Sequence, residues 1–154
     1  MYFEPIDGLP VFMPVKSTSK AAAYDLSSRC SCVVEAGQTA LIRTGVRTKL
    51  PDHVVGLVCS RSGLALKNSV FVLNAPGVID ADYDQEIGVI LFNASFHPFY
   101  VEEGMRVAQM LFVHSATYAD AGTENVRTGG FGSTGVSNMC VDNGLMYDEL
   151  DTPK

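Results

Sequence analysis

Short apolar runs separated by turn residues recur along this chain at intervals of about ten residues, and no long helical pattern interrupts them. Gly, Pro, Asn and Asp mark most of the breaks, which is typical of strands joined by tight turns. No segment is long enough for a crossover helix, so a doubly wound α/β fold is excluded. The pattern predicts an all-β barrel or sandwich. The expected strands are Cys30–Val34, Thr39–Ile42, Gly56–Cys59, Val70–Leu73, Ile87–Phe92, Phe99–Val101 and Met105–Val113.

The composition fits one domain with a real core and an acidic surface. Of 154 residues, 47% are hydrophobic and 18% are charged, and the net charge is -6. This charge argues against a nucleic-acid surface, but local arginines and a divalent cation can still accommodate a small phosphorylated substrate. No membrane-length apolar run and no signal-peptide pattern occur. We therefore expect a soluble, intracellular protein, cytoplasmic or nuclear, that binds neither nucleic acid nor membranes.

The cysteines and histidines do not form a metal-ligand pattern. Cys30 and Cys32 are separated by one residue, and no second pair exists, whereas zinc sites usually place about two to four residues between paired ligands. Cys59 and Cys140 are isolated, and the three histidines are scattered. We expect reduced cysteines that bind no metal.

The stretch from Gly56 to Asn93 carries the candidate chemistry. After an apolar strand, Arg61-Ser62-Gly63 precedes a short run of good helix formers, Leu64 to Lys67. Free backbone N–H groups and a guanidinium converge at such a turn, so it is a plausible anion cradle. An ordinary helix N-cap by a serine explains the same residues, and the tripeptide alone is a weak signal.

An acidic cluster ends the same stretch. Asp80, Asp82 and Asp84 alternate, so their side chains share one face of an extended backbone. Three neighbouring carboxylates repel one another unless a cation or hydrogen-bond donors lie nearby. A solvated turn accounts for Asp82 and Asp84 equally well. Asp80 is the least turn-like, because Val78–Ile79 tie it to the core, and it is the candidate general base.

The C-terminal part of the chain changes in composition. Residues 127–135 are dense in glycine around a single aromatic, Phe131. A flexible linker is one interpretation, and a dinucleotide-binding loop is excluded because no strand-turn-helix context surrounds the glycines. An aromatic among glycines also suits a phosphate-binding segment whose ring stacks on a base. The remainder, 136–154, is acidic and weakly apolar, and we expect it to be partly disordered.

Taken together, these motifs resemble the homotrimeric dUTPase family, the deoxyuridine triphosphate nucleotidohydrolases. Its five motifs occur here in order, as AAAYDL, SRSGLALK, NAPGVIDADYDQEI, GMRVAQMLF and RTGGFGSTG. The match runs from about Ala21 to Gly135. The resemblance implies a distorted jelly-roll or β-clip barrel with one short helix, assembling as a homotrimer with shared active sites. Residues 1–135 would be the catalytic domain, with 119–135 as a mobile arm, and 136–154 an extension.

The resemblance also implies residue roles. Asp80 would orient and deprotonate the attacking water, and Asp25 would hold a water of a Mg²⁺ ion carried by the triphosphate. Tyr83 would lie against the deoxyribose and exclude a 2′-hydroxyl, and Phe131 would stack on the uracil. Phosphate oxygens would contact Arg61, Ser62, Gly63, Gln109, Arg127, Gly132 and Ser133. The uracil edge would be read by the Asn74 side chain and by backbone groups of the segment that includes Gly77, Val78 and Ile79.

The chain departs from the usual family pattern at several positions. Ala23 stands where Gly is usual, Ser60 where Pro is usual, Gln85 where Gly is common and Met105 where Asp is common. None of these changes removes a direct catalytic group. In the fifth motif one residue fewer than usual separates Arg127 from the Gly-Gly-Phe.

The implied activity is Mg²⁺-dependent hydrolysis of dUTP to dUMP and pyrophosphate, which limits uracil incorporation into DNA and supplies dUMP for thymidylate synthesis. A dCTP deaminase on the same scaffold is an alternative, although the strand Gly88 to Asn93 lacks the glutamate expected of that branch. A nucleotide-responsive regulatory protein is a second alternative, which the acidic residues from Asp142 to Asp151 motivate.

Overall fold

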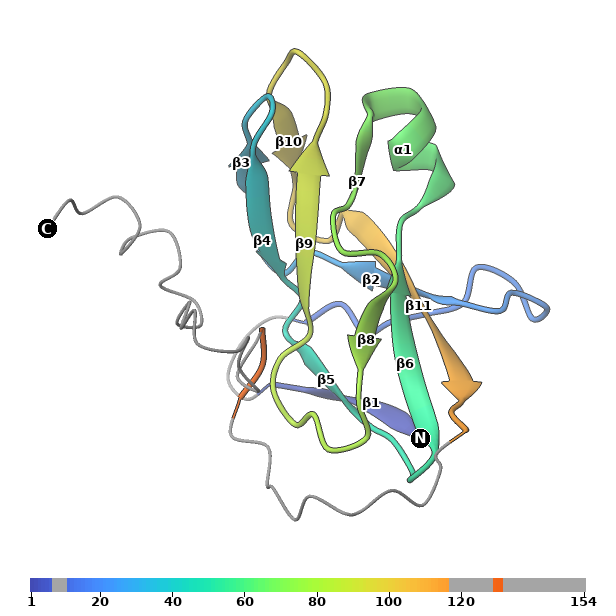
Figure 1. Cartoon of the computed structure of the whole chain (residues 1–154). Coiled ribbons are helices and arrows are strands. Elements are labelled where there is room, and N and C mark those ends of the chain that lie inside the picture. The colour runs from blue at the N-terminus through green and yellow to red at the C-terminus, as the bar shows by residue number, and fades with distance from the viewer. Residues whose placement is uncertain (7–10, 117–128, 132–154) are drawn as a thin grey trace, which may run out of the picture. The chain divides into compact units, whose positions relative to one another are not determined.

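The computed structural model describes residues 1–6, 11–116 and 129–131. Contacts divide the chain into two units, Met1–Thr117 and Tyr118–Lys154, and the fold below is that of the first unit. Its elements are β1 (Tyr2–Pro5), β2 (Tyr24–Ser27), β3 (Cys32–Val34), β4 (Thr39–Arg43), β5 (Val46–Lys49), β6 (Val54–Cys59), α1 (Ser62–Asn68), β7 (Val70–Val72), β8 (Gly77–Ile79), β9 (Gly88–Asn93), β10 (Phe99–Val101) and β11 (Arg106–His114) (Figure 1).

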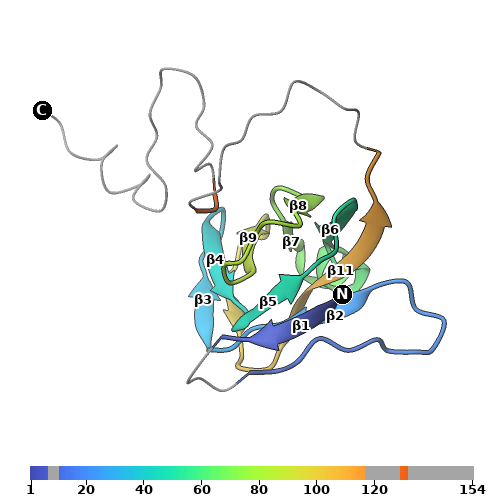
Figure 2. The ribbon, with the colours of Figure 1, turned by 90° about the horizontal axis from the view of Figure 1, so that it is seen from below.

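Two antiparallel sheets build the body of this unit. One has four strands in the order β2-β11-β6-β8, and the other has three in the order β4-β9-β7. Two strand pairs complete it: β1 with β5 (Figure 2), and β3 with β10 (Figure 1). Turn spacing and the absence of helical periodicity predicted this all-β class, and the structure confirms it.

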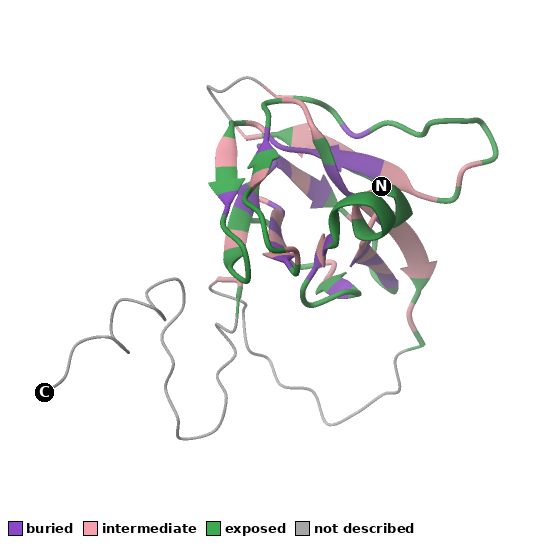
Figure 3. Cartoon of the chain, turned by 90° about the horizontal axis from the view of Figure 1, so that it is seen from above, coloured by how far each residue is buried: buried purple, intermediate pink, exposed green. Residues whose placement is uncertain are grey.

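The core lies between the two sheets and follows from strand alternation. Along β6 every second residue is buried, and the residues between them are half-buried. Burial of the alternate apolar side chains supplies the main driving force for this packing (Figure 3). Core side chains come from both sheets and from β3, β5 and β10: Leu26, Val34, Ile42, Val46, Val58, Val70, Val72, Ile87, Val89, Leu91, Val101, Val107, Ala108 and Met110.

A glycine in β6 leaves room for a side chain of β11 at the centre of the four-stranded sheet. Gly56 is paired with Phe112, two residues from Met110. A Cβ atom built at Gly56 would lie 1.9 Å from the Met110 Cε, a methyl group that is itself fully buried. A larger residue therefore cannot occupy position 56 unless Met110 moves.

The short helix α1 lies on the surface and buries none of its residues (Figure 3). The helix formers Leu64 to Lys67 predicted it, and it ends at Ser69, whose left-handed φ of 56° closes the last turn. No helix among the described residues is long and apolar enough to cross a membrane.

Strand β2 was not predicted, because its alternation covers only the four residues Tyr24 to Ser27 and follows three alanines that carry no strand signal. It pairs with β11 along one edge, and Val15 bridges to Asp25. Its last three residues, Asp25 to Ser27, are buried, so the polar Asp25 and Ser27 are enclosed as well as Leu26.

Candidate active site

Four polar side chains from β2, β11 and the turn after β6 form a cluster, which we call the arginine cluster: Asp25, Arg61, Arg106 and Gln109. The Asp25 carboxylate accepts hydrogen bonds from Arg61 Nε at 3.1 Å and from Arg106 at 3.0 Å. Arg61 also donates to the Arg106 carbonyl at 3.0 Å, and Gln109 donates to the Ser60 carbonyl at 2.8 Å. Two guanidinium groups around one carboxylate leave a net positive charge, which suits a phosphate site.

A β-bulge places Arg106 in this cluster. The register of β11 against β2 shifts between Arg106 and Ala108, so Arg106 pairs with Ser27 while Gln109 pairs with Asp25. In a regular strand, residues 106 and 109 would point to opposite faces. The extra residue reverses that parity and brings both side chains to the side of Asp25, as bulges near active sites commonly do.

The helix that follows Arg61 presents open backbone donors beside the cluster. Arg61 is the N-cap, without a side-chain capping bond, and the first intrahelical bond runs from the Ala65 N–H to the Arg61 carbonyl. Ser62 and Gly63 are exposed in the first turn, where backbone N–H groups have no intrahelical acceptor. The capping role considered for Ser60 or Ser62 is therefore wrong, since Arg61 holds that position.

The segment formed by β7, a turn and β8 carries the residues expected to read the base. We call it the β7–β8 hairpin, although its two strands pair with β9 and with β6 and not with each other. Asn74 is exposed in the turn, Gly77 is buried and Ile79 is half-buried, while Val78 exposes 58% of its surface. A Cβ atom at Gly77 would lie 3.2 Å from the Asn74 Nδ2 and 3.6 Å from the Val58 Cβ. Glycine at position 77 thus lets the Asn74 amide lie against the backbone of β8.

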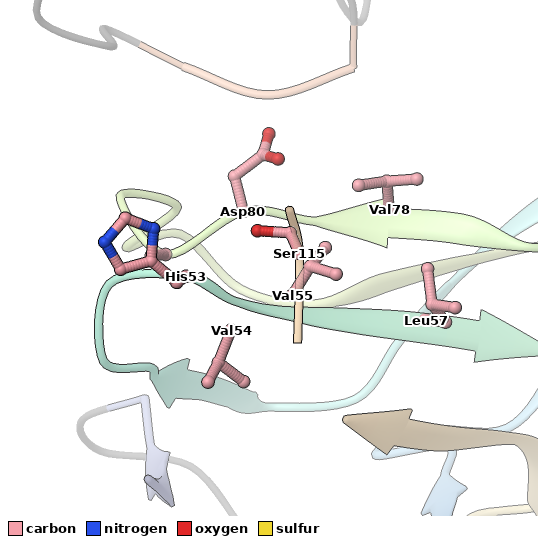
Figure 4. Close-up of a pocket in the computed structure, with 8 residues that line it drawn as sticks. His53, Val54, Val55, Leu57, Val78, Asp80 and Ser115 are labelled. Atoms are coloured by element: carbon pink, nitrogen blue, oxygen red, sulfur yellow. The ribbon is translucent and has the colours of Figure 1, made fainter. Parts of the chain in front are cut away.

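Asp80 follows β8, at the end of the four-stranded sheet that lies opposite to the arginine cluster. It is half-buried and lines a pocket of about 400 Å³ together with His53, Val55, Leu57, Val78 and Ser115, among others (Figure 4). Figure 4 shows its carboxylate directed away from the strands rather than into the core. The acidic group is therefore available at the surface of a pocket.

The structure does not bring Asp80 and the arginine cluster together within one chain. Ile79 pairs with Gly56, which is five residues before Arg61. Because β8 runs antiparallel to β6, Asp80 lies one residue further from Arg61 than Ile79 does. About 20 Å of extended backbone along β6 therefore separates the position of Asp80 from Arg61. The two groups therefore lie toward opposite ends of β6 in a single subunit.

The loop after Asp80 is fixed by a buried carboxylate, Glu86. Its oxygens accept hydrogen bonds from Arg43 Nε at 2.6 Å, from Arg43 Nη2 and from the Gly45 N–H at 2.7 Å, and Arg29 lies 3.5 Å away. Burial alone would raise the pKa of Glu86. The hydrogen bonds and the two positive charges outweigh it and hold the pKa below its ordinary value.

Tyr83 lies within this loop. Its ring is 7% exposed, and its hydroxyl donates to the Glu86 carbonyl at 2.9 Å. The Tyr83 N–H donates to the Asp80 carbonyl, closing a turn. Tyr83 and Asp80 are therefore held in one rigid loop.

The glycine-rich segment lies mostly outside the described residues. Arg127, Gly132 and Ser133 fall there, as does the extension 136–154. Phe131 is described, with 44% of its surface exposed and a left-handed φ of 50°.

The described residues do not form a protein cage for a metal ion, since no three His, Cys, Asp or Glu side chains gather there. Asp25 accepts from two arginines and from the Ser17 hydroxyl at 3.1 Å. An ionised carboxylate offers about four acceptor positions, so roughly one remains for a water. This donor set fits a Mg²⁺ ion that reaches Asp25 through a water, and it does not fit direct ligation by several side chains.

Sequence analysis missed two residues of this region. Arg106 was assigned no role, although it lies in the same motif as Gln109. Regular strand alternation would put Arg106 on the face of β11 opposite to Gln109. The bulge turns Arg106 to the same face as Gln109 and allows its contact with Asp25. Glu86 was also missed, because its partners Arg29, Arg43 and Gly45 are more than forty positions away in the sequence.

The chain matches a known family model and named proteins. The dUTPase model matches residues 10–135. A deoxyuridine 5'-triphosphate nucleotidohydrolase of Rickettsia felis is 41% identical over 131 residues, 80% of this chain and 88% of that protein. The protein of the same name from Alkaliphilus metalliredigens is 45% identical over 120 residues, 75% of this chain and 83% of its own.

Solved structures agree with these sequence matches. The crystal structure of dUTPase from Streptococcus mutans has a TM-score of 0.74 at 26% identity, covering 78% of this chain and all of its own. A mutant dUTPase of Staphylococcus bacteriophage 80alpha with dUpNHpp has a TM-score of 0.71 at 25% identity, covering 87% and 97%. The fold is thus the distorted jelly roll of these enzymes. This chain belongs to the dUTPase family.

Proposed function

We propose that this protein hydrolyses dUTP to dUMP and pyrophosphate. The observation that carries the proposal is the placement of two half-sites on one face of the four-stranded sheet. The arginine cluster lies at one end of β6, and Asp80 lies at the other. A positive phosphate site and a pocket-lining carboxylate are the two parts that water attack on a triphosphate requires.

The separation of these half-sites supports a shared site in a homotrimer. Asp25, Cys59 and Gln109 occupy neighbouring register positions, so their side chains share the outer face of this sheet. Between the two half-sites that face is apolar and only half-buried in the single chain, with Val55, Leu57, Leu111, Val113 and the exposed Val78. Packing against a second copy covers this surface and sets one chain's Asp80 beside another chain's arginine cluster.

In the assembled site, each group has a defined task. Asp80 orients a water against the α-phosphorus and accepts its proton, an effect worth about 10²–10⁴-fold in typical enzymes. Arg61, Gln109 and the N–H groups of Ser62 and Gly63 hold the phosphate oxygens in place. Mg²⁺, when bound by the phosphates and by a water on Asp25, supplies charge neutralisation at the oxygens.

Base selection rests on the hairpin. The Asn74 amide and backbone groups between Gly77 and Ile79 present a fixed pairing edge to uracil. Cytosine reverses the polarity of that edge and would leave buried polar groups unpaired. Tyr83 lies against the deoxyribose, and the arm that contains Arg127, Phe131, Gly132 and Ser133 closes over the site.

Residues 1–135 form the catalytic domain in this proposal, and 136–154 an extension. The reaction removes dUTP from the pool available for DNA synthesis and yields dUMP for thymidylate synthesis. Both consequences follow from the reaction itself.

The test is a nucleotide panel with Mg²⁺, run beside light scattering for mass. We expect pyrophosphate release from dUTP in large excess over dTTP, dCTP and UTP, and a mass of three chains. Ammonia release from dCTP, without pyrophosphate from dUTP, would instead establish the deaminase.

Asp80→Asn is the sharpest variant for the base. It keeps the size of the side chain and removes the proton acceptor, so turnover should fall by at least about 10²-fold while nucleotide binding changes little. The matched control is Asp82→Asn, an exposed acid two residues away. A turnover number for Asp80→Asn close to that of the wild type would remove Asp80 from the mechanism.

A further inference from the structure

Ser60 connects the arginine cluster to the β7–β8 hairpin through hydrogen bonds that the proposed chemistry does not use. It lies between the end of β6 and Arg61. Its hydroxyl accepts a hydrogen bond from the Val72 N–H at 2.9 Å, and its carbonyl accepts from Gln109 at 2.8 Å. The residue that follows it, Arg61, holds Asp25. One serine thus contacts the arginine cluster on one side and the hairpin on the other.

The contact with Val72 joins the two sheets at the base of the hairpin. Val72 is the last residue of β7, which belongs to the β4-β9-β7 sheet, whereas Ser60 extends β6 of the other sheet. The next residue, Leu73, donates its N–H to the Ile90 carbonyl of β9 at 2.9 Å. Because successive N–H groups of a strand point to opposite edges, the Val72 N–H points away from β9 and toward Ser60.

Both arms of the hairpin are therefore anchored on the same segment. The returning arm, β8, pairs through Gly77 with Val58. The outgoing arm is held by Ser60, two residues further along the chain. The distance between the arms, and with it the position of Asn74 relative to the backbone of β8, depends on these two anchors.

We infer that Ser60 is a positioning residue for base recognition: its hydroxyl sets the spacing of the β7–β8 hairpin and so the selectivity for uracil over cytosine. The inference rests on the proposed function, because it assigns the hairpin to the base. Ser60 touches neither the phosphates nor the attacking water in this assignment. Its effect belongs in KM and in selectivity rather than in the chemical step.

The experiment compares four proteins on dUTP and dCTP: wild type, Ser60→Ala, Ser60→Thr and Ser31→Ala. Ser60→Ala removes the acceptor of the Val72 N–H, and Ser60→Thr retains a hydroxyl. Ser31→Ala is the matched control, because the Ser31 hydroxyl also accepts a backbone N–H, that of Glu103 at 3.1 Å, in an exposed loop.

We expect Ser60→Ala to raise the KM for dUTP and to lower the dUTP over dCTP selectivity, each by about tenfold, while kcat changes by less than about threefold. Ser60→Thr should restore both quantities, and Ser31→Ala should leave them unchanged. A folded, active Ser60→Ala protein with wild-type KM and selectivity would overturn the inference alone. Wild-type protein that releases no pyrophosphate from dUTP would overturn the proposed function and this inference with it.

If circular dichroism and light scattering show that Ser60→Ala does not fold, hydrogen exchange of the Val72 amide in the wild-type protein tests the inference instead. In the wild type the Val72 amide should be protected, and dUMP should increase that protection because its base binds against the hairpin in the proposed function. Rapid exchange at Val72 with and without dUMP would overturn the inference.

Discussion

Asp25 is a buried carboxylate that orients two arginines in this fold and has a binding role in the function that we propose. It is 9% exposed and is held by Arg61, Arg106 and Ser17. A buried carboxylate without such donors would be costly, and two guanidiniums without the carboxylate would repel each other. Its ion pairs therefore fix the direction from which the arginines face a phosphate.

Asp25→Asn should weaken substrate binding more than it slows the chemical step. The amide cannot neutralise two guanidiniums, and one of its donors would face them. Hydrogen bonds to charged groups are worth about 1.5–3 kcal/mol, so KM for dUTP should rise by about 10- to 100-fold. Steady-state kinetics checks this, with Asp84→Asn as the control, since Asp84 is exposed and contacts Gln85 beside it. An unchanged KM would show that the arginines do not need Asp25.

Glu86→Gln should change the pH dependence of stability. The pKa of Glu86 lies below its ordinary value of 4.5 in the folded state, so its ionised form stabilises the fold above that pH. This contribution is lost as the pH falls below 4.5 through the lowered pKa. Urea unfolding at pH 7 should show a deficit of about 1–3 kcal/mol for Glu86→Gln, narrowing toward pH 3. A deficit that stays constant with pH would mean that Glu86 acts through packing alone.

The strands of the four-stranded sheet set the geometry of the candidate site, and β11 does so through its bulge and its packing on β6. The absence of a side chain at Gly56 leaves room for Met110. A larger residue at position 56 should disturb the strands that carry Gln109 and the Ser60 turn. Substitutions of Gly56 and Met110 therefore test the packing of these strands independently of catalysis.

Gly56→Ala should destabilise the protein by about 1–3 kcal/mol, because the new methyl group would overlap the Met110 side chain in a filled core. Met110→Ala creates room at the cost of a cavity, and in combination the two changes should cost less than their sum. Chemical denaturation of the double-mutant cycle measures this coupling. Gly63→Ala is the control: nothing lies within 4 Å of its Cβ position, and alanine favours a helix. Strictly additive costs would contradict the proposed contact.

Much of this architecture was readable from the sequence, for identifiable reasons. Turn residues and alternating apolar positions predicted the strands at β6, β7, β9 and β11 and the turn at Asn74 to Gly77. Strand β2 escaped because its alternation covers only four residues. The role of Arg106 escaped because a bulge changes the face of a side chain without leaving a clear mark in the sequence.

At the scale of the whole molecule, the two residues expected to share one active site are close in the sequence but lie toward opposite ends of a strand. Asp80 and Arg61 are nineteen residues apart in the chain, and the hairpin returns the chain along β6 in the direction away from Arg61. Only the resemblance to a trimeric family indicated a shared site, and the register of β8 on β6 is the structural argument for the shared site that we propose.

Subunit mixing tests the shared site directly. Asp80→Asn and Arg61→Ala proteins should each be nearly inactive. When they are refolded together in equal amounts, about a quarter of the sites should combine an intact Asp80 with an intact Arg61 from another chain. Pyrophosphate release from dUTP by the mixture measures that recovery, with a mixture of Asp80→Asn and wild type as the reference. A mixture that is no more active than its components would place both residues in a site formed by one chain.

The opposed ends of β6 have a consequence for inheritance and dosage. In the proposed trimer, each chain would lend its acid to one neighbour and its arginines to another, so a copy with one faulty group would remove one reaction centre. Two different missense alleles, one at Asp80 and the other at Arg61, would then complement each other in part in one cell. Newly synthesised chains would remain silent until they had met their companions, so cleavage capacity would climb more steeply than expression at low abundance.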